Sequence, residues 1–393
     1  MDGVREDAAA RAAELKGRAE ALVPAIEARA RETESLRRLP DETIADIRAA
    51  GLHRLTQPRR FGGAELPLDS VIDIVSVLAR GCASTAWVCG VYSDHAIIAG
   101  MCDPAVADAI WGENPDAAIS AGYLPSGTAE RAADGWRLSG RWGFASGCDF
   151  ADWLIFGSLL PDSDGNKVPS LCFVPRSDVQ IEDDWEVMGL AGTGSKTVIL
   201  DGADVPAWRT IPFADVNGGG GVRGRDVPPL YRLPHITAVP FLFCGTALGI
   251  AESFLETTTE TMRTHSSRGQ PVAEYQTMQL HIAEASAELD CARLLVMRDA
   301  RETMAAMEEG RDLTLMEKGR NRRDMGYAGR LCSQAVNRLF GATGSVAIFN
   351  SNIAQRKYRD MSAVARHVTV NWDIGGTIYG RIAFGLDPGA RFI

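Results

Sequence analysis

Residues 127–140 read GTAERAADGWRLSG, which is the pattern of a β-hairpin. Asp134-Gly135 is a preferred two-residue turn, and the runs on either side of it are short. Further short runs, with turn signals between them, extend over Ile119 to Asp201. This spacing predicts a small, compact β-barrel or sandwich in the middle of the chain.

Helical patterns lie on both sides of this region. From Ala8 to Trp111 apolar residues recur three and four apart, and Asp103-Pro104 is a typical helix start. From His235 onward the helical period returns. Four long segments follow, roughly Ile236–Thr264, Ala273–Met307, Leu313–Phe340 and Ser351–Gly380. Four such segments in a row predict an up-down bundle.

The order of elements predicts an α+β fold in three parts. We expect an N-terminal helical domain over 1–116, a central small β-barrel domain over 117–215 and a C-terminal four-helix bundle over 216–393. With 393 residues, 46% hydrophobic and 23% charged, the chain has a globular composition and is long enough for such an arrangement.

Charge and targeting signals narrow the class of protein. The net charge of −10 argues against nucleic acid or an anionic membrane as a partner. The sequence shows no apolar run of about 18 residues, no signal peptide and no Cys-x-x-Cys pair. We therefore expect a cytoplasmic protein that binds neither nucleic acid nor membranes.

The common cofactor and metal motifs are absent. There is no P-loop, no dinucleotide-binding Gly-x-Gly-x-x-Gly between a strand and a helix, and no His-Glu-x-x-His. The six histidines are dispersed, so no metal site is predicted. Composition and spacing alone thus predict a large α+β protein without specifying its chemistry.

Five short strings, taken together with the α, β, α order, resemble the acyl-CoA dehydrogenase fold. Within it, the chain resembles the oxygenase components of two-component flavin-dependent monooxygenases, such as p-hydroxyphenylacetate hydroxylase. The strings are RFGG (60–63), GCASTAW (81–87), WGFASG (142–147), GLAGTGS (189–195) and YRD (358–360).

This resemblance implies a reaction and its partners. The protein would bind reduced FMN or FAD, delivered by a separate NAD(P)H:flavin reductase, and react it with O₂ to a flavin C4a-hydroperoxide. One oxygen atom would then pass to a small aromatic substrate, most simply a phenol. The family usually forms homotetramers, so we expect one here. The sequence does not choose between FMN and FAD.

Three alternatives remain open. The same flavin chemistry could oxidise nitrogen or sulfur, or the chain could be an acyl-CoA dehydrogenase or a non-catalytic relative. Many dehydrogenases carry a glutamate base shortly after an Arg-Asp pair. Here no carboxylate follows Arg359-Asp360 before Asp373, and His367 lies roughly in that place. This difference disfavours the dehydrogenase alternative.

The resemblance also assigns catalytic roles. His95, Ser146 and His367 are the expected catalytic residues. His95 would take the proton of a phenol, because an imidazole titrates near neutral pH. Ser146 would hydrogen-bond the flavin near N5, and His367 would contact substrate or hydroperoxide. Ser120 would help His95 to hold the substrate oxygen.

The remaining expected contacts are binding residues. Asn371 and Trp372 are expected to line the substrate pocket. The flavin is expected to contact Trp142, Phe144, Ser146, Thr193, Ser195, Arg263 and Arg268. The two arginines would reach the flavin phosphates, often from a neighbouring subunit, since a guanidinium binds phosphate through two parallel hydrogen bonds. The sequence does not choose between Arg263 and Arg268.

Overall fold

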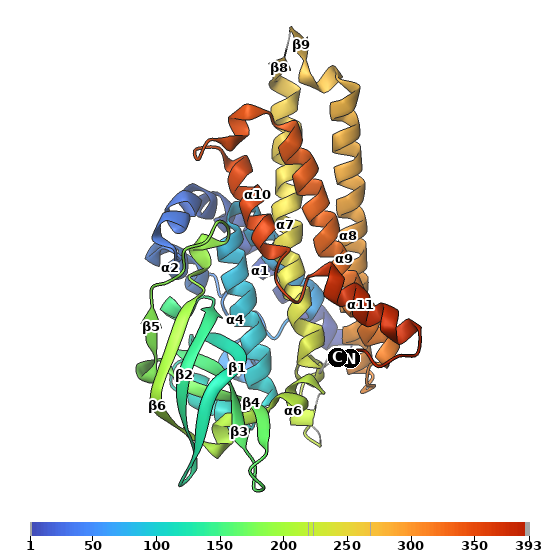
Figure 1. Cartoon of the computed structure of the whole chain (residues 1–393). Helices are drawn as coiled ribbons and strands as arrows, with labels where there is room; N and C mark the ends of the chain where they lie inside the picture. The colour runs from blue at the N-terminus through green and yellow to red at the C-terminus, as the bar shows by residue number, and fades with distance from the viewer. Residues whose placement is uncertain (1, 219, 223, 268, 390–393) are drawn as a thin grey trace.

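The computed structural model describes residues 2–218, 220–222, 224–267 and 269–389, and it has the predicted order of helices, sheet and helices (Figure 1). The first region contains α1 (Asp2–Leu36), α2 (Asp41–Ala49), α3 (Leu68–Gly81), α4 (Ala83–Met101) and α5 (Pro104–Trp111). Asp103 caps α5 as predicted, because its Oδ1 accepts the N–H of Ala105 at 2.9 Å.

The central region is a seven-stranded sheet with strand order β5-β6-β2-β1-β3-β4-β7. The strands are β1 (Ile119–Ala132), β2 (Gly135–Ala145), β3 (Trp153–Pro161), β4 (Lys167–Pro175), β5 (Gln180–Glu182), β6 (Lys196–Pro206) and β7 (Thr210–Pro212). Only β1 and β3 are parallel neighbours. The predicted hairpin is confirmed, with Ala132 paired to Gly135.

The side chain of Trp142 lies in the hydrophobic core that this sheet encloses. A Cβ at Gly122 or Gly127 of β1 would come within 2.3 Å or 2.1 Å of the Trp142 side chain, so glycine is required at both positions. The register of β1 against β3 shifts between these two glycines. The indole N–H of Trp142 donates to the carbonyl of Gly157 at 2.8 Å. Trp142 is therefore a core residue of the β domain.

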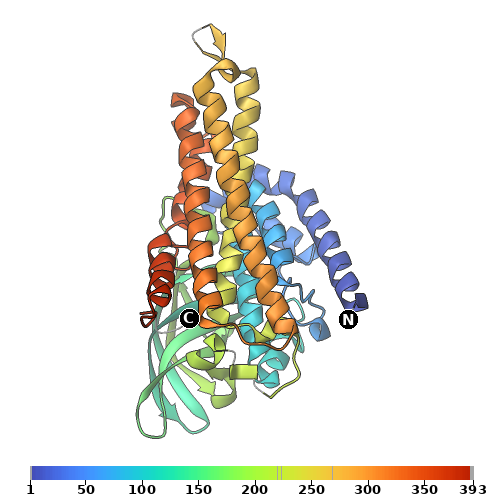
Figure 2. The same cartoon turned by 90° about the vertical axis from the view of Figure 1, so that its right-hand side faces the viewer.

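The third region is the helical bundle, in which three long helices run side by side (Figure 2). They are α7 (His235–Thr264), α8 (Gln276–Glu308) and α9 (Leu315–Ala342), preceded by the short α6 (Phe213–Asn217). A small hairpin, β8 (Ser266–Ser267) and β9 (Gln270–Pro271), connects α7 to α8.

The prediction of one last helix over Ser351–Gly380 is wrong. The chain forms two helices there, α10 (Ile353–Val364) and α11 (Trp372–Ala383), separated by a turn. Asn371 starts α11, because its Oδ1 accepts the backbone N–H groups of Asp373 and Ile374 at 3.0 and 3.3 Å. A side chain that caps a new helix competes with continuation of the old one.

The N-terminal helices and the bundle share one hydrophobic core, while the sheet encloses a second. The division of the chain at 116 and 215 therefore remains a prediction. The contact between α3 and α7 is unusually close. A Cβ at Gly245 would lie 2.9 Å from the carbonyl oxygen of Ile72, and one at Gly249 would lie 2.0 Å from that of Ser76.

Helix α7 is long and apolar enough to cross a membrane, by length and composition alone. However, 88% of its most apolar window is buried inside the protein. This burial is what the central helix of a globular core shows.

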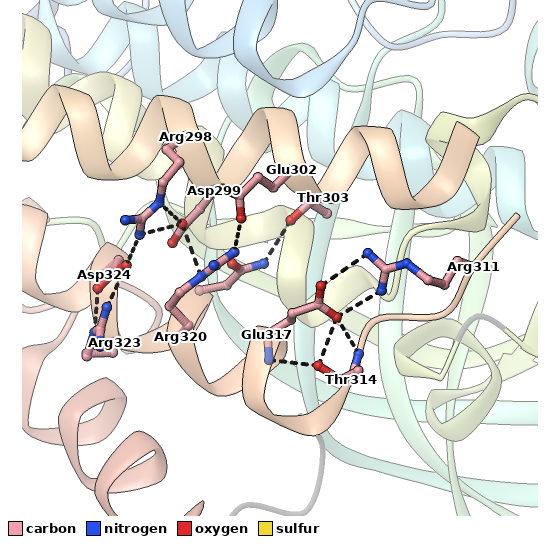
Figure 3. A network of polar contacts seen from close by, with 11 residues as sticks. Arg298, Asp299, Glu302, Thr303, Arg311, Thr314, Glu317, Arg320, Arg323 and Asp324 are labelled. Carbon is pink, nitrogen blue, oxygen red and sulfur yellow. Dashed lines mark hydrogen bonds and ion pairs between the residues drawn. The ribbon is translucent and has the colours of Figure 1, made fainter. Parts of the chain in front are cut away.

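A polar network fixes the packing of α8 against α9 (Figure 3). Arg298 of α8 bonds Asp299 at 2.8 Å and reaches across to Asp324 of α9 at 2.5 Å. At the start of α9, Thr314 and Glu317 form a capping box, each bonding the backbone N–H of the other. The guanidinium of Arg311 also pairs with Glu317 and, as the largest cause, lowers the pKa of that carboxyl to about 2.

Candidate active site

Helix α4 lies between the β domain and α7 (Figure 1) and is buried on every side. His95 on this helix is hydrogen-bonded through Nδ1 to the carbonyl oxygen of Ile119 at 2.8 Å. A carbonyl only accepts, so Nδ1 carries the hydrogen and Nε2 of the neutral ring is left as an acceptor. Burial lowers the pKa of His95, which keeps the ring neutral.

The next residue of β1 ties His95 to Ser146. Ser120 follows Ile119, and its Oγ donates to the carbonyl oxygen of Ser146 at 2.8 Å. His95 and Ser146 are thus held by two consecutive residues at the start of β1. The expected contact of Ser120 with a substrate oxygen remains a prediction.

A chain of hydroxyl groups begins at Ser146. Trp87 Nε1 donates to Ser146 Oγ at 3.2 Å, and Ser146 Oγ lies 2.6 Å from Ser195 Oγ. Ser195 Oγ lies 2.7 Å from Thr193 Oγ1, which donates to the carbonyl oxygen of Leu190 at 2.8 Å. The indole N–H only donates and the carbonyl only accepts. All hydroxyl hydrogens between these ends must therefore point from Ser146 towards Leu190. Ser146 Oγ keeps one free lone pair and no free hydrogen.

His367 joins the same site through Trp87. The two rings meet edge to face with centroids 5.2 Å apart, and the ring of Phe243 on α7 lies 4.5 Å from that of His367. His367 lies in the turn between α10 and α11 and not on a helix as expected. Burial, as the largest cause, lowers its pKa to about 4, so it is neutral at physiological pH.

The structure adds three residues that sequence reasoning missed. Asp94 Oδ1 is 2.8 Å from His235 Nε2, and His235 Nδ1 is 3.1 Å from the hydroxyl of Tyr123. Asp94 Oδ2 also lies 3.8 Å from Nε2 of His95. Residues 94 and 235 are far apart in the chain, and the only available signal was a Ser-Asp-His string within an otherwise apolar helix.

The surface beside Ser146 fits a flavin ring. Phe144 has a φ of 63° and a side chain that is 74% exposed, and its ring meets Trp185 at 5.8 Å. A bulky residue with positive φ is uncommon and persists where the surrounding structure enforces it. Met188, three residues after Trp185 in the sequence, is also exposed. The exposed apolar side chains offer a surface for a flat ring, and the Ser146 hydroxyl beside them accepts a hydrogen bond. Reduced flavin has a flat ring and an N–H group at N5, so it fits both features.

Several expected contacts have other roles in this chain. The Trp142 ring lies inside the sheet at 2% exposure, which corrects its assignment as a flavin contact. Asn371 Oδ1 caps α11, and Trp372 packs on Tyr327 of α9 at 5.2 Å. Their expected place in the substrate pocket remains a prediction. Thr193 and Ser195 are buried and bond one another, and Ser195 also bonds Ser146. Their contact with the flavin remains a prediction.

The two arginines are not placed at this site. Arg263 is exposed, pairs with Glu260 at 3.0 Å and lies at the end of α7 opposite His235. The 28 residues between His235 and Arg263 span about 42 Å of helix. Arg263 therefore does not reach the Ser146 region of its own chain. Arg268 lies outside the described residues.

Comparison with known proteins agrees with this geometry. Residues 241–372 match the family model for the acyl-CoA dehydrogenase C-terminal domain. The FADH₂-dependent resorcinol hydroxylase oxygenase component of Rhizobium sp. is 36% identical over 96% of each chain. The p-hydroxyphenylacetate 3-hydroxylase oxygenase component of Acinetobacter baumannii is 31% identical, over 93% of this chain and 88% of the relative.

A solved structure matches over the whole chain. XiaF from Streptomyces sp., in complex with FADH₂ and glycerol, has a TM-score of 0.95 with 29% identity, and the match covers 100% of both chains. The fold, the histidines and serines around α4, and these relatives lead to one conclusion. The chain belongs to the oxygenase components of two-component flavin-dependent monooxygenases, which are enzymes with the acyl-CoA dehydrogenase fold.

Proposed function

We propose that this chain hydroxylates a small phenol, using reduced FMN or FAD supplied by a separate reductase. Reduced flavin, when bound, would supply the two electrons that activate O₂, of which one atom goes to the substrate and the other leaves as water. The residues of this chain bind the substrate, take its proton and exclude water.

His95 is the base in this proposal, and its hydrogen bond to Ile119 is the observation that carries it. That bond leaves Nε2 without a hydrogen in a buried site. Nε2 takes the phenol proton, and the electron pair left on the phenol oxygen makes the ring carbons more nucleophilic. Ser120 donates its hydrogen to the carbonyl of Ser146, so its free lone pair contacts the substrate as an acceptor, while the phenol still carries its proton.

Ser146 is the acceptor for the flavin N5 hydrogen, because the hydroxyl chain leaves it only a lone pair. The rings of Trp87, Phe243 and His367 pack together beside it and exclude water. A dry site protects a reactive flavin species from decomposition.

The experiment uses the purified chain, chemically reduced FMN or FAD, labelled O₂ and resorcinol. The expected product carries one additional, labelled oxygen atom on the ring. Parallel reactions with a thioether and an amine test the alternative oxidations. Labelled product from those two substrates but not from resorcinol would contradict the proposal, as would anaerobic reduction of bound FAD by an acyl-CoA.

We also propose that the protein is a cytoplasmic homotetramer in which Arg263 contacts the flavin phosphates of a neighbouring subunit. Exposed apolar side chains on the bundle support an assembly, and they include Leu280, Leu294, Val346, Ile348 and Phe349. Sedimentation analysis is expected to give a tetramer. A monomer would exclude a role for Arg263, since it does not reach the site of its own chain.

A further inference from the structure

Asp94 is a buried carboxylate between two imidazoles, and the proposed hydroxylation does not itself assign it a role. It is 3% exposed, on the helix that also carries His95. Its Oδ1 accepts a hydrogen bond from His235 Nε2 at 2.8 Å, while its Oδ2 lies 3.8 Å from His95 Nε2. A buried carboxylate is costly unless it is paired, so this placement calls for an explanation.

The partners of Asp94 are themselves fixed. His235 Nε2 donates to the carboxylate at 2.8 Å, and its Nδ1 lies 3.1 Å from the hydroxyl of Tyr123, within hydrogen-bond distance. The rings of Tyr123 and His235 also stack, with centroids 5.5 Å apart. These contacts come from β1 and α7 and hold the carboxylate with one oxygen turned towards His95.

We propose that Asp94 is the counter-charge that makes His95 a base, with His235 and Tyr123 as positioning residues that hold the carboxylate in place. This inference rests on the proposed function of His95. When a phenol binds, its O–H bond breaks, an N–H bond forms at His95 Nε2, and the electron pair stays on the phenol oxygen. Asp94 stays charged and His235 keeps its proton, so no other reactant is needed.

The charges around His95 agree with this role. The groups that face it are Asp94 on its own helix and His235 on α7, while Tyr123 on β1 faces His235. Burial lowers the pKa of His95 and Asp94 opposes that shift. Without the carboxylate, the imidazolium would be stabilised by the new phenolate alone, and a larger share of the proton would remain on the phenol.

The test measures ionisation of a bound phenol without any oxygenation. The full-length chain is titrated with 4-nitrophenol, whose absorption distinguishes phenol from phenolate, both without flavin and with reduced FMN under anaerobic conditions. The pH at which half of the bound probe is ionised is compared between wild type and Asp94→Asn. We expect that midpoint to rise by about one pH unit, a tenfold smaller ionisation constant.

Matched variants separate the possible results. Asp108→Asn makes the same charge change on the surface helix α5 and is expected to leave the midpoint unchanged. His95→Ala is expected to abolish ionisation of the bound probe. An unchanged midpoint in Asp94→Asn, together with loss of ionisation in His95→Ala, would overturn the role of Asp94 and leave the proposed function standing. Wild-type ionisation in His95→Ala, or binding of the neutral phenol only, would overturn both.

Folding of the variants is checked by circular dichroism. If Asp94→Asn does not fold, the double variant Asp94→Asn/His235→Gln replaces the carboxylate–imidazole pair with two amides that can hydrogen-bond each other. It is expected to show the same tenfold loss of ionisation, and a midpoint equal to that of wild type would overturn the proposal.

Discussion

The rings of Trp87 and His367 meet edge to face, with their centroids 5.2 Å apart. Trp87 also donates its N–H to Ser146. One side chain of α4 therefore contacts both the hydroxyl expected at the flavin and the histidine expected above it. This arrangement places residues from α4, from the turn after β2 and from the α10–α11 turn in one site.

The orientation of the hydroxyl chain gives a prediction for Ser195→Ala. Removing Ser195 Oγ frees the hydrogen of Ser146, which could then donate to the N5 of oxidised flavin, an atom that carries no hydrogen. The preference for reduced over oxidised FMN is expected to fall by about 2–10-fold, the worth of one hydrogen bond. Equilibrium binding of both redox states measures it. Ser170→Ala, a buried serine of β4, serves as control, and an unchanged preference in Ser195→Ala would contradict the inferred polarity.

The base role of His95 predicts a selective defect in His95→Ala. Phenol hydroxylation is expected to fall by about 10²–10⁴-fold, since a positioned base contributes that much. Consumption of O₂ by reduced flavin is expected to continue and release hydrogen peroxide instead of product. The yields of hydroxylated product and of hydrogen peroxide measure how much of the consumed O₂ is used for hydroxylation. His265→Ala, at an exposed position, is the control, and full hydroxylation by His95→Ala would refute the assignment.

His367 predicts a pH-dependent stability. Its pKa is about 4 in the folded chain against an ordinary 6.5, so the unfolded chain binds a proton between these values and the folded chain does not. The free energy of unfolding must therefore decrease as the pH falls from about 6.5 towards 4, by at most about 1.4 kcal/mol per pH unit from this group. In urea unfolding at several pH values, the free energy of unfolding of His367→Gln is expected to decrease less steeply with falling pH than that of wild type. Equal pH slopes in wild type and variant would be inconsistent with a half-buried ring that stays neutral.

The capping box of α9 predicts a stability effect far from the site. Thr314→Ala leaves helix N–H groups without a partner and is expected to cost roughly 1 kcal/mol. The low pKa of Glu317 stabilises the folded chain above its ordinary value of 4.5, and this contribution is lost as the pH falls towards 2. Because glutamine does not titrate, the free energy of unfolding of Glu317→Gln, measured with urea, is expected to lack this decrease as the pH falls from 4.5 towards 2. Thr343→Ala, at the other end of α9, provides a comparison.

Local patterns predicted most of the fold. The Asp134-Gly135 turn and the Asp103 cap depend on neighbours in sequence, and both predictions are confirmed. The break before Asn371 was missed because residues 365–370 contain no glycine or proline. A single capping side chain stops the helix there, and asparagine is common enough elsewhere that it carries a weak signal.

The site was only partly accessible from sequence. The family resemblance predicted His95 and Ser146 as site residues, but it does not say which way a side chain faces. Trp142 belongs to the same string as Ser146, and in a regular strand two residues four apart would share a face. The register of β2 against β6 shifts between Trp142 and Ala145, however, and the Trp142 ring lies in the sheet. His235 and Tyr123 meet Asp94 only because α7 and β1 pack against α4, which no local pattern encodes.

The glycine contact between α3 and α7 has a consequence for how the chain is made. Gly245 and Gly249 lie against Ile72 and Ser76, which leave the ribosome more than 160 residues earlier. The helices of the first region thus lack their packing surface until α7 has been synthesised. We expect an N-terminal fragment ending near residue 116 to expose apolar surface and to need chaperones, with the mature core closing only after translation has passed α7.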